Sequence, residues 1–210
     1  MPPMLPVRTA VAPIRPSALC LFVAAFFLAT AGVAAERTLT LDPEASTATF
    51  VLEATAHQVH GRLDVPAASI TFDDATGEAA GTLRLDARRV TTDHTKRDAK
   101  MHREVLKSED HPSILFEVER LKGEPWRGTP GANSAVDAVL VGTVTLAGSR
   151  HPLEIPLLVS VEGERLRAEG TFVVPYVAWG LEDPSVLFLR VAKEVEVSLE
   201  IEGRLGEPAA

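Results

Sequence analysis

Residues 194–202 read EVEVSLEIE, in which apolar side chains alternate with charged or small polar ones. This period of two is typical of a strand with one face buried and the other in solvent. Residues 153–162 read LEIPLLVSVE and repeat the pattern, with Leu153 and Ile155 on one face and Glu154 and Glu162 on the other. Both stretches therefore predict half-buried strands of an antiparallel sheet.

The same alternation recurs along most of the chain. Turn-forming glycines, such as Gly77, Gly148 and Gly163, separate the alternating segments. Short connections favour antiparallel neighbours, because parallel strands need long crossovers. The sequence therefore predicts an all-β fold of about eight antiparallel strands, two of which are the stretches above. The other six are expected at residues 47–54, 61–73 with a break near Pro66, 78–86, 113–121, 138–146 and 165–175.

Residues 92–107 interrupt the strand pattern with strong helix formers and contain neither glycine nor proline. We expect one helix here, with Asp93 as its N-cap. One helix among eight strands fits an antiparallel β-barrel with a helical cap.

The interior of an eight-stranded barrel is either filled by side chains or wide enough for one small ligand. Small residues at inward positions leave space for a ligand, but they also accommodate bulges and tight packing around a filled interior. The sequence leaves both alternatives open. The bulky inward residues are Phe50, Leu52, Phe72, Leu83, Leu85, Phe116, Phe172 and Val174, and the small ones are Ala54, Gly81, Ala168 and Gly170.

Residues 1–35 differ in composition from the rest of the chain. Arg8 and Arg15 precede an apolar run at residues 18–31, small residues follow it, and no acidic residue occurs before Glu36. This layout predicts a secretory signal peptide, and the run is shorter than the roughly 18 residues of a membrane-spanning helix. We expect cleavage after Ala34 or Ala35, one β-barrel domain at residues 36–210, and a periplasmic or secreted protein. An uncleaved membrane anchor is the alternative.

Charge and cysteine content exclude several classes of protein. The full chain has 21 basic and 29 acidic residues, a net charge of -8, and loss of Arg8 and Arg15 with the signal leaves 19 basic residues and a charge of -10. Such a chain lacks the basic surface that binds nucleic acid. The single cysteine, Cys20, lies in the predicted signal, so disulfides and thiolate metal sites are excluded from the mature protein.

Motifs for catalysis are absent from the sequence. It contains no Gly-x-Ser-x-Gly elbow, no phosphate-binding glycine loop and no His-Glu-x-x-His. The best metal candidate places His94, Asp98 and His102 at steps of four along one helical face, but no fourth ligand is near. We expect neither an enzyme nor a bound metal or other cofactor.

Several short motifs occur together in and around the expected helix. They are Thr91-Thr92, Arg97-Asp98 followed by Met101 and Leu106, His111-Pro112 before Ile114-Leu115-Phe116, and the hairpin GTVTLAG at 142–148 with His151-Pro152. Their order and spacing resemble the YceI family of lipocalin-like, polyisoprenoid-binding periplasmic proteins over residues 38–204. Residues 175–185 depart from the family pattern and keep only its aromatic-glycine pair, Trp179-Gly180.

This resemblance implies an eight-stranded lipocalin-like barrel that takes a polyisoprenoid or quinone-like lipid into its interior without catalysis. The bulky inward residues would line the lipid tail, with Trp179 at the portal or in the core. A polar head group would stay at the mouth, near Arg97, Arg103, Lys96 or Lys100 on the helix. Alternatively, Arg97 and Asp98 anchor the helix to the barrel rim. The alternative for the whole protein is an envelope interaction module with a filled barrel, and a homodimer is possible in either case.

Overall fold

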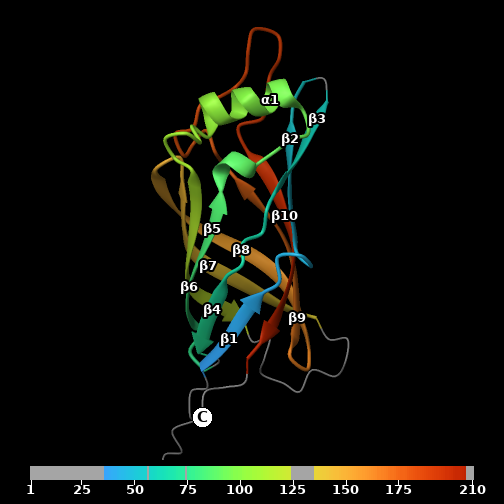
Figure 1. The fold of residues 1–210 in the computed structure, drawn as a ribbon, viewed down its shortest axis with the longest axis vertical. Coiled ribbons are helices and arrows are strands. Elements are labelled where there is room, and N and C mark those ends of the chain that lie inside the picture. Colours follow the sequence, from blue (N-terminus) through green and yellow to red (C-terminus); the bar gives the residue numbers. More distant parts are fainter. Residues whose placement is uncertain (1–35, 56, 74, 124–134, 207–210) are drawn as a thin grey trace, which may run out of the picture. The chain divides into compact units, whose positions relative to one another are not determined.

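The computed structural model describes residues 36–55, 57–73, 75–123 and 135–206, and these form a ten-stranded antiparallel sheet that closes into a barrel (Figure 1). The predicted signal peptide at residues 1–35 lies outside the described residues. The strands are β1 Glu36–Leu41, β2 Thr47–Glu53, β3 Gln58–Leu63, β4 Ser69–Asp73, β5 Glu78–Asp86, β6 Ser113–Gly123, β7 Val136–Leu146, β8 Ser149–Glu162, β9 Arg165–Val174 and β10 Val195–Leu205. Three short helical segments lie between β5 and β6, namely η1 Ala87–Arg89, α1 Thr95–Lys100 and η2 Met101–Val105.

Eight of these strands form the closed ring. They follow one another in the order β1, β4, β5, β6, β7, β8, β9 and β10, and β10 pairs back to β1. The closing contact is short, with Leu39 opposite Leu205 and Leu41 opposite Gly203. The predicted eight-stranded antiparallel barrel is therefore confirmed.

The remaining hairpin, β2 with β3, extends the wall at one end of the barrel. One edge of β10 pairs with β9, and the other edge is divided between two strands, since residues 203–205 pair with β1 and residues 196–200 pair with β2. Beyond β3 the wall continues through a bridge between Arg62 and Thr91, just before α1. The helical segments thus cover this end of the barrel.

Strand membership differs from the sequence prediction in two places. The strand β1 is not among the predicted segments, and residues 61–73 form two strands, β3 and β4, because the chain leaves the sheet around Pro66. Proline has no backbone N–H to donate to a strand partner, so the break falls where the sequence indicates a weak point.

The helix is shorter than predicted and begins one residue later. His94 is its N-cap, and the His94 Nδ1 atom accepts a hydrogen bond from the Arg97 backbone N–H at 3.4 Å. The prediction of Asp93 as N-cap is wrong, because Asp93 adopts a φ of 57° and its carboxylate accepts a hydrogen bond from Arg62 Nη1 at 2.7 Å. Asp93 therefore joins the helical cap to β3.

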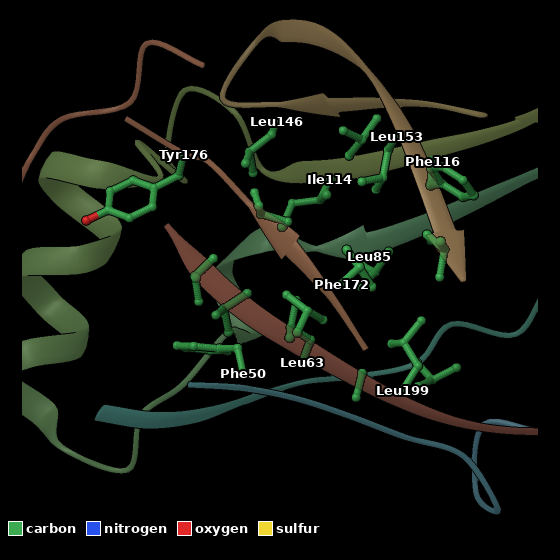
Figure 2. Close-up of a pocket in the computed structure, with 18 of the residues that line it drawn as sticks. Phe50, Leu63, Leu85, Ile114, Phe116, Leu146, Leu153, Phe172, Tyr176 and Leu199 are labelled. Atoms are coloured by element: carbon green, nitrogen blue, oxygen red, sulfur yellow. The ribbon is translucent and has the colours of Figure 1, made fainter. Parts of the chain in front are cut away.

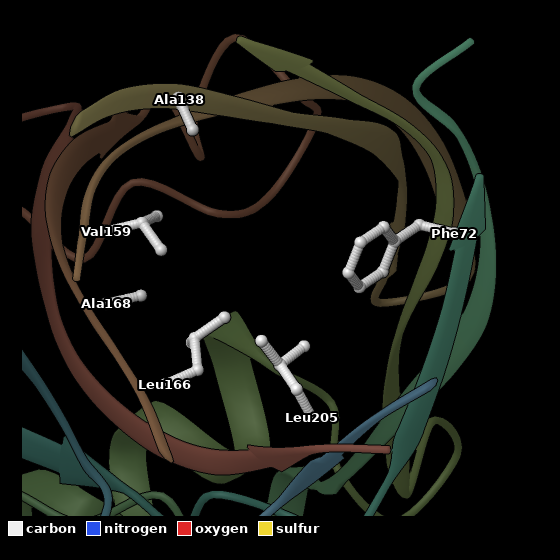
Figure 3. Close-up of a cluster of buried hydrophobic side chains, with 6 residues drawn as sticks. All are labelled: Phe72, Ala138, Val159, Leu166, Ala168 and Leu205. Atoms are coloured by element: carbon white, nitrogen blue, oxygen red, sulfur yellow. The ribbon is translucent and has the colours of Figure 1, made fainter. Parts of the chain in front are cut away.

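The inward faces of the strands carry the apolar side chains in three clusters. Figure 3 shows one of them, in which Phe72, Ala138, Val159, Leu166, Ala168 and Leu205 point inward from the ring of strands. A second surrounds Phe116 and Ile155, and a third packs Leu146 and Tyr176 beneath the helical segments. Among the described residues no large side chain is less than 2% exposed, and a filled core of this size would hold some.

The described helices are also short. None of them, in the part of the chain that the structure describes, has the length and apolar character needed to span a membrane.

Candidate functional site

The inward faces of the strands enclose a cavity of about 690 Å³ (Figure 2). Figure 2 shows side chains from different strands pointing toward the same space, among them Phe50, Leu85, Phe116, Phe172 and Leu199. A volume of this size lies within the range of small-molecule sites, roughly 300–1,000 Å³. The sequence leaves open whether the barrel interior is filled by side chains or wide enough for a ligand. The structure shows a hollow interior.

The structure places every predicted lining residue on the wall of this cavity. Strand parity accounts for this agreement at the eight residues that lie on strands, because alternate side chains of a strand share a face. Trp179 lies in the segment between β9 and β10. Pairing register adds detail that parity lacks: Val197 of β10 lies between Phe50 of β2 and Phe172 of β9. That these residues contact a ligand stays a prediction. The nine residues are Phe50, Leu52, Phe72, Leu83, Leu85, Phe116, Phe172, Val174 and Trp179.

The small inward residues divide into two kinds. Ala54 and Ala168 line the cavity, as expected for residues that leave space. Gly81 and Gly170 do not line it, and for these two the second alternative, tight packing, describes the structure. A Cβ atom on Gly81 would lie 2.9 Å from the Ser69 carbonyl oxygen, and one on Gly170 would lie 2.3 Å from the Pro156 carbonyl oxygen. These glycines therefore allow neighbouring strands to approach closely.

The charged and imidazole groups of the lining are confined to two neighbouring stretches at the helical end. His57 lies between β2 and β3, and His94, Lys96, Arg97 and Lys100 lie in or next to α1. Among the described residues, no aspartate or glutamate belongs to the lining of this cavity. The cavity is thus apolar along the barrel and cationic at the helical end, and we call this end, with His57, His94, Lys96, Arg97 and Lys100, its mouth.

The first turn of α1 is fixed to the barrel rim by Thr92, a buried residue. Arg97 donates from Nε to Thr92 Oγ1 at 2.7 Å and from Nη2 to the Thr92 carbonyl oxygen at 3.0 Å. Asp98 accepts hydrogen bonds from the Thr91 hydroxyl at 2.7 Å, the Thr92 N–H at 2.8 Å and the Thr92 hydroxyl. Arg97 thus has the anchoring role that the sequence offered as one alternative. Because it also lines the cavity, a contact with a head group stays a prediction.

These contacts act on the ionisation of Asp98. Partial burial raises the pKa of the carboxyl group, but the hydrogen bonds from Thr92 and Thr91 and the charge of His102 outweigh burial and hold the pKa below its ordinary value. Asp98 is therefore a charged anchor of the helical cap at neutral pH.

Arg103, the second head-group candidate, lies elsewhere. It is not part of the cavity lining, and its exposed guanidinium pairs with Glu104. The two arginines that the sequence treats alike are thus separated by the structure, with only Arg97 at the mouth.

The candidate metal ligands are not assembled into a site. The Asp98 carboxylate is occupied by the two threonines, the His94 ring caps the helix, and the His102 Nδ1 atom lies 3.2 Å from the Ser108 hydroxyl. Within the described residues, no group of three or more His, Cys, Asp or Glu side chains is placed to hold a metal ion.

Sequence reasoning missed the contribution of the segment between β9 and β10. Leu181, Pro184, Leu189 and Val191 line the cavity, and Trp179 stacks on His151 with ring centroids 4.6 Å apart and planes 1° from parallel. The apolar run VLFL at residues 186–189 was the available signal, since such a run is unusual in a turn between strands.

A closed antiparallel barrel of eight strands around an apolar cavity, capped by a short helix, defines the lipocalin-like class of hollow barrels. Comparison with known protein families identifies the family within this class of barrels. The model of the YceI-like domain matches residues 39–203, and the chain belongs to that family.

Solved structures agree with this assignment at the level of the fold. A polyisoprenoid binding domain from Saccharophagus degradans is 17% identical, with a TM-score of 0.60 over 82% of this chain and 99% of that one. BcnA of Burkholderia cenocepacia is 14% identical, with a TM-score of 0.60 over 77% and 98%. A YceI protein of Campylobacter jejuni is 15% identical, with a TM-score of 0.55 over 71% and 86%. The search of curated proteins found no match.

Proposed function

We propose that the protein is an exported, non-catalytic carrier that holds a polyisoprenoid-type lipid in its barrel. The observation that carries this proposal is the apolar cavity of about 690 Å³, with cations at its mouth and, in the part of the chain that the structure describes, no carboxylate in its lining. A prenyl chain is apolar along its whole length, and its burial contributes about 25 cal/mol for each Å² removed from water. The Saccharophagus degradans domain, described as polyisoprenoid binding, supports the same ligand class.

The mouth favours a particular kind of head group. Lys96, Arg97 and Lys100 present only positive charge and hydrogen-bond donors, so they suit a phosphate, a carboxylate or a quinone carbonyl. A cationic head group would meet like charge there. The proposed ligand is therefore an amphiphile with an acceptor head and a prenyl tail, with the tail in the barrel.

Two further parts of the proposal rest on the sequence. The signal-peptide layout of residues 1–35 supports export to the periplasm or beyond. The lack of a recognised catalytic motif, together with the anchoring roles of Asp98 and Arg97, supports binding without catalysis.

The direct test is to recover the ligand. The protein is expressed with residues 1–35, purified from the periplasm and extracted with organic solvent, and the extract is analysed by lipid mass spectrometry. We expect a prenyl lipid in stoichiometric amount. The proposal fails if no such lipid is recovered and the extracted, refolded protein also leaves the fluorescence of a dansyl-labelled prenyl alcohol unchanged.

A matched pair of variants tests the mouth. Lys96→Gln removes a cavity-lining charge, and Arg103→Gln removes one outside the lining on the same helical cap. For a dansyl-labelled prenyl phosphate, we expect Lys96→Gln to weaken binding several-fold, because an exposed charge pair contributes up to about 1 kcal/mol. Arg103→Gln should bind like the parent protein. Equal loss in both variants would mean that net charge, rather than the mouth, determines affinity.

A further inference from the structure

Residues 186–189, which we name the apolar tip, expose large hydrophobic side chains at the end of a turn. Val186 is 52% exposed, Leu187 88%, Phe188 92% and Leu189 37%. Single apolar residues are common on protein surfaces, but adjacent leucine and phenylalanine side chains almost wholly in solvent are not. Such an exposed apolar patch indicates a surface that binds a protein or a membrane.

The apolar tip is a built structure. The Val186 N–H donates to the Leu189 carbonyl at 3.0 Å, and the Leu189 N–H donates to the Val186 carbonyl at 2.7 Å. Leu187, between them, has a φ of 29°, which L residues seldom adopt. The turn thus holds the side chains of Leu187 and Phe188 in one orientation.

The base of the apolar tip is tied to the barrel on two sides. The Arg190 N–H donates to the Thr55 hydroxyl at 2.9 Å, and the Thr55 N–H donates to the Arg190 carbonyl at 2.9 Å. Lys100 of α1 donates from Nζ to the Pro184 carbonyl at 3.1 Å. The tip therefore projects from a fixed base beside the helical cap.

This base borders the mouth of the cavity. Pro184, Leu189 and Val191 belong to the cavity lining, as do Lys96 and Lys100. In Figure 1 the segment between β9 and β10, drawn in red-orange, rises past α1 at the end of the barrel that the helix covers. Whatever binds the apolar tip will lie next to the cavity opening.

We propose that the apolar tip is a membrane-docking element, with Leu187 and Phe188 inserted into the surface of a phospholipid bilayer. A convex turn with two adjacent apolar side chains suits shallow insertion at the boundary of head groups and acyl chains. A stable protein partner needs about 800 Å² on each side, more than a projecting turn offers. Arg190, which is exposed and directly follows the tip in the chain, would meet the lipid phosphates, as would Lys96, an exposed residue of the helix whose Lys100 contacts Pro184.

The chemistry of insertion predicts how docking responds to salt and to lipid charge. The chain carries a net charge of -8, which opposes attraction to an anionic surface. Apolar burial must then supply the binding free energy. Docking should persist at raised salt and on uncharged vesicles, unlike the binding of a basic protein. Docking goes beyond the proposed function, since an empty barrel would still dock, and the two proposals fail separately.

Site-specific fluorescence tests the insertion. In the full chain with Cys20→Ser, a single cysteine is introduced as Leu187→Cys or, in the β8–β9 turn, as Glu164→Cys, and is labelled with the polarity-sensitive dye NBD. With vesicles of phosphatidylcholine, alone or mixed with phosphatidylglycerol, we expect a blue shift and a several-fold rise in emission for the label at 187 only. The same spectrum with and without vesicles at 187, or equal shifts at both sites, would overturn the proposal.

A second measurement uses the side chains themselves. Residues 18–31 are apolar and occur in every variant, so vesicle flotation is read as a difference between variants. Leu187→Ser with Phe188→Ser should lower partitioning about tenfold or more, because two large apolar side chains no longer leave water. Leu158→Ser, on the outside of β8, is the matched control and should have no effect. If a protein from the envelope, but not vesicles, shields the label at 187, the partner is a protein and the membrane proposal is wrong.

Discussion

At the scale of single residues, Asp98 connects the helical cap to the rest of the molecule. Its carboxylate accepts three hydrogen bonds from Thr91 and Thr92, the two residues that precede the helix at the barrel rim. Hydrogen bonds to a charged group contribute about 1.5–3 kcal/mol when they are sheltered. Asp98 and Arg97 therefore both fix the helix beside the cavity mouth, and Asp98 does so through three hydrogen bonds.

We predict that Asp98→Asn lowers the free energy of unfolding by about 1–3 kcal/mol, because the amide cannot accept all three hydrogen bonds. The lowered pKa of Asp98 gives the pH dependence: the carboxylate stabilises the fold above the unfolded pKa near 3.8, and this stabilisation is lost as pH falls through the folded pKa. In urea denaturation at a series of pH values, the free energy of unfolding should decrease less toward acid pH in the variant than in the parent protein. Asp93→Asn, at an exposed ion pair, is the control and should change stability by less than about 1 kcal/mol.

At the scale of elements, the segment between β9 and β10 is attached from within by Tyr176. Its hydroxyl donates to the Ala192 carbonyl at 2.6 Å, across the base of the segment that carries the apolar tip. Burial, with a smaller contribution from the charge of Asp183, raises the pKa of Tyr176 to about 12. The phenol thus remains protonated well above the pH at which an exposed tyrosine ionises.

Tyr176 is the only tyrosine of the chain, so tyrosinate absorbance reports on this residue alone. We predict a titration midpoint near 12 in the folded protein and near 10 in denaturant. Because the folded pKa is raised, the stabilisation from this group is complete below about pH 10 and is lost as pH rises toward 12. A folded-state midpoint near 10 would show that the segment is not packed on Tyr176.

The sequence predicts a strand and its inward face well where side chains alternate regularly. It predicts a residue's role poorly where that role depends on contacts with residues far away in the chain. Alternation in residues 153–162 and 194–202 predicts β8 and β10, and it also assigns Phe172 and Leu85 to the inside. The role of Gly170 depends on the Pro156 carbonyl oxygen in a neighbouring strand, which spacing along the chain does not reveal. Likewise Arg97 and Arg103 look equivalent until the Thr92 contacts fix the helix.

At the scale of the whole molecule, the hollow interior changes what a core substitution does. Val144 and Val118 are equally buried, at 7% and 6% exposed, and both belong to the cluster around Phe116. Only Val144 lines the cavity. One valine therefore borders open space and the other borders packed atoms, in the same region of the barrel.

We predict that Val118→Phe lowers the free energy of unfolding by about 1–3 kcal/mol, as overpacking does in a dense core. Val144→Phe should cost markedly less, because the larger ring extends into the cavity, and it should reduce the capacity for the prenyl probe. Thermal unfolding measures the first effect, at about 2–4 °C for each kcal/mol in a chain of this size. Equal destabilisation by both substitutions would indicate that the barrel is packed solid.

The short contact that closes the ring also bears on how the protein folds. β1 and β10 are joined through residues such as Leu39 and Leu205, which lie at opposite ends of the described sequence. Contacts between such distant residues form slowly, because a long loop must close before they are gained. We therefore expect an open, curved sheet to form first and to close last. During that interval the interior is reachable from the side as well as from the mouth, so a prenyl chain present while the protein folds could be enclosed without threading through the opening.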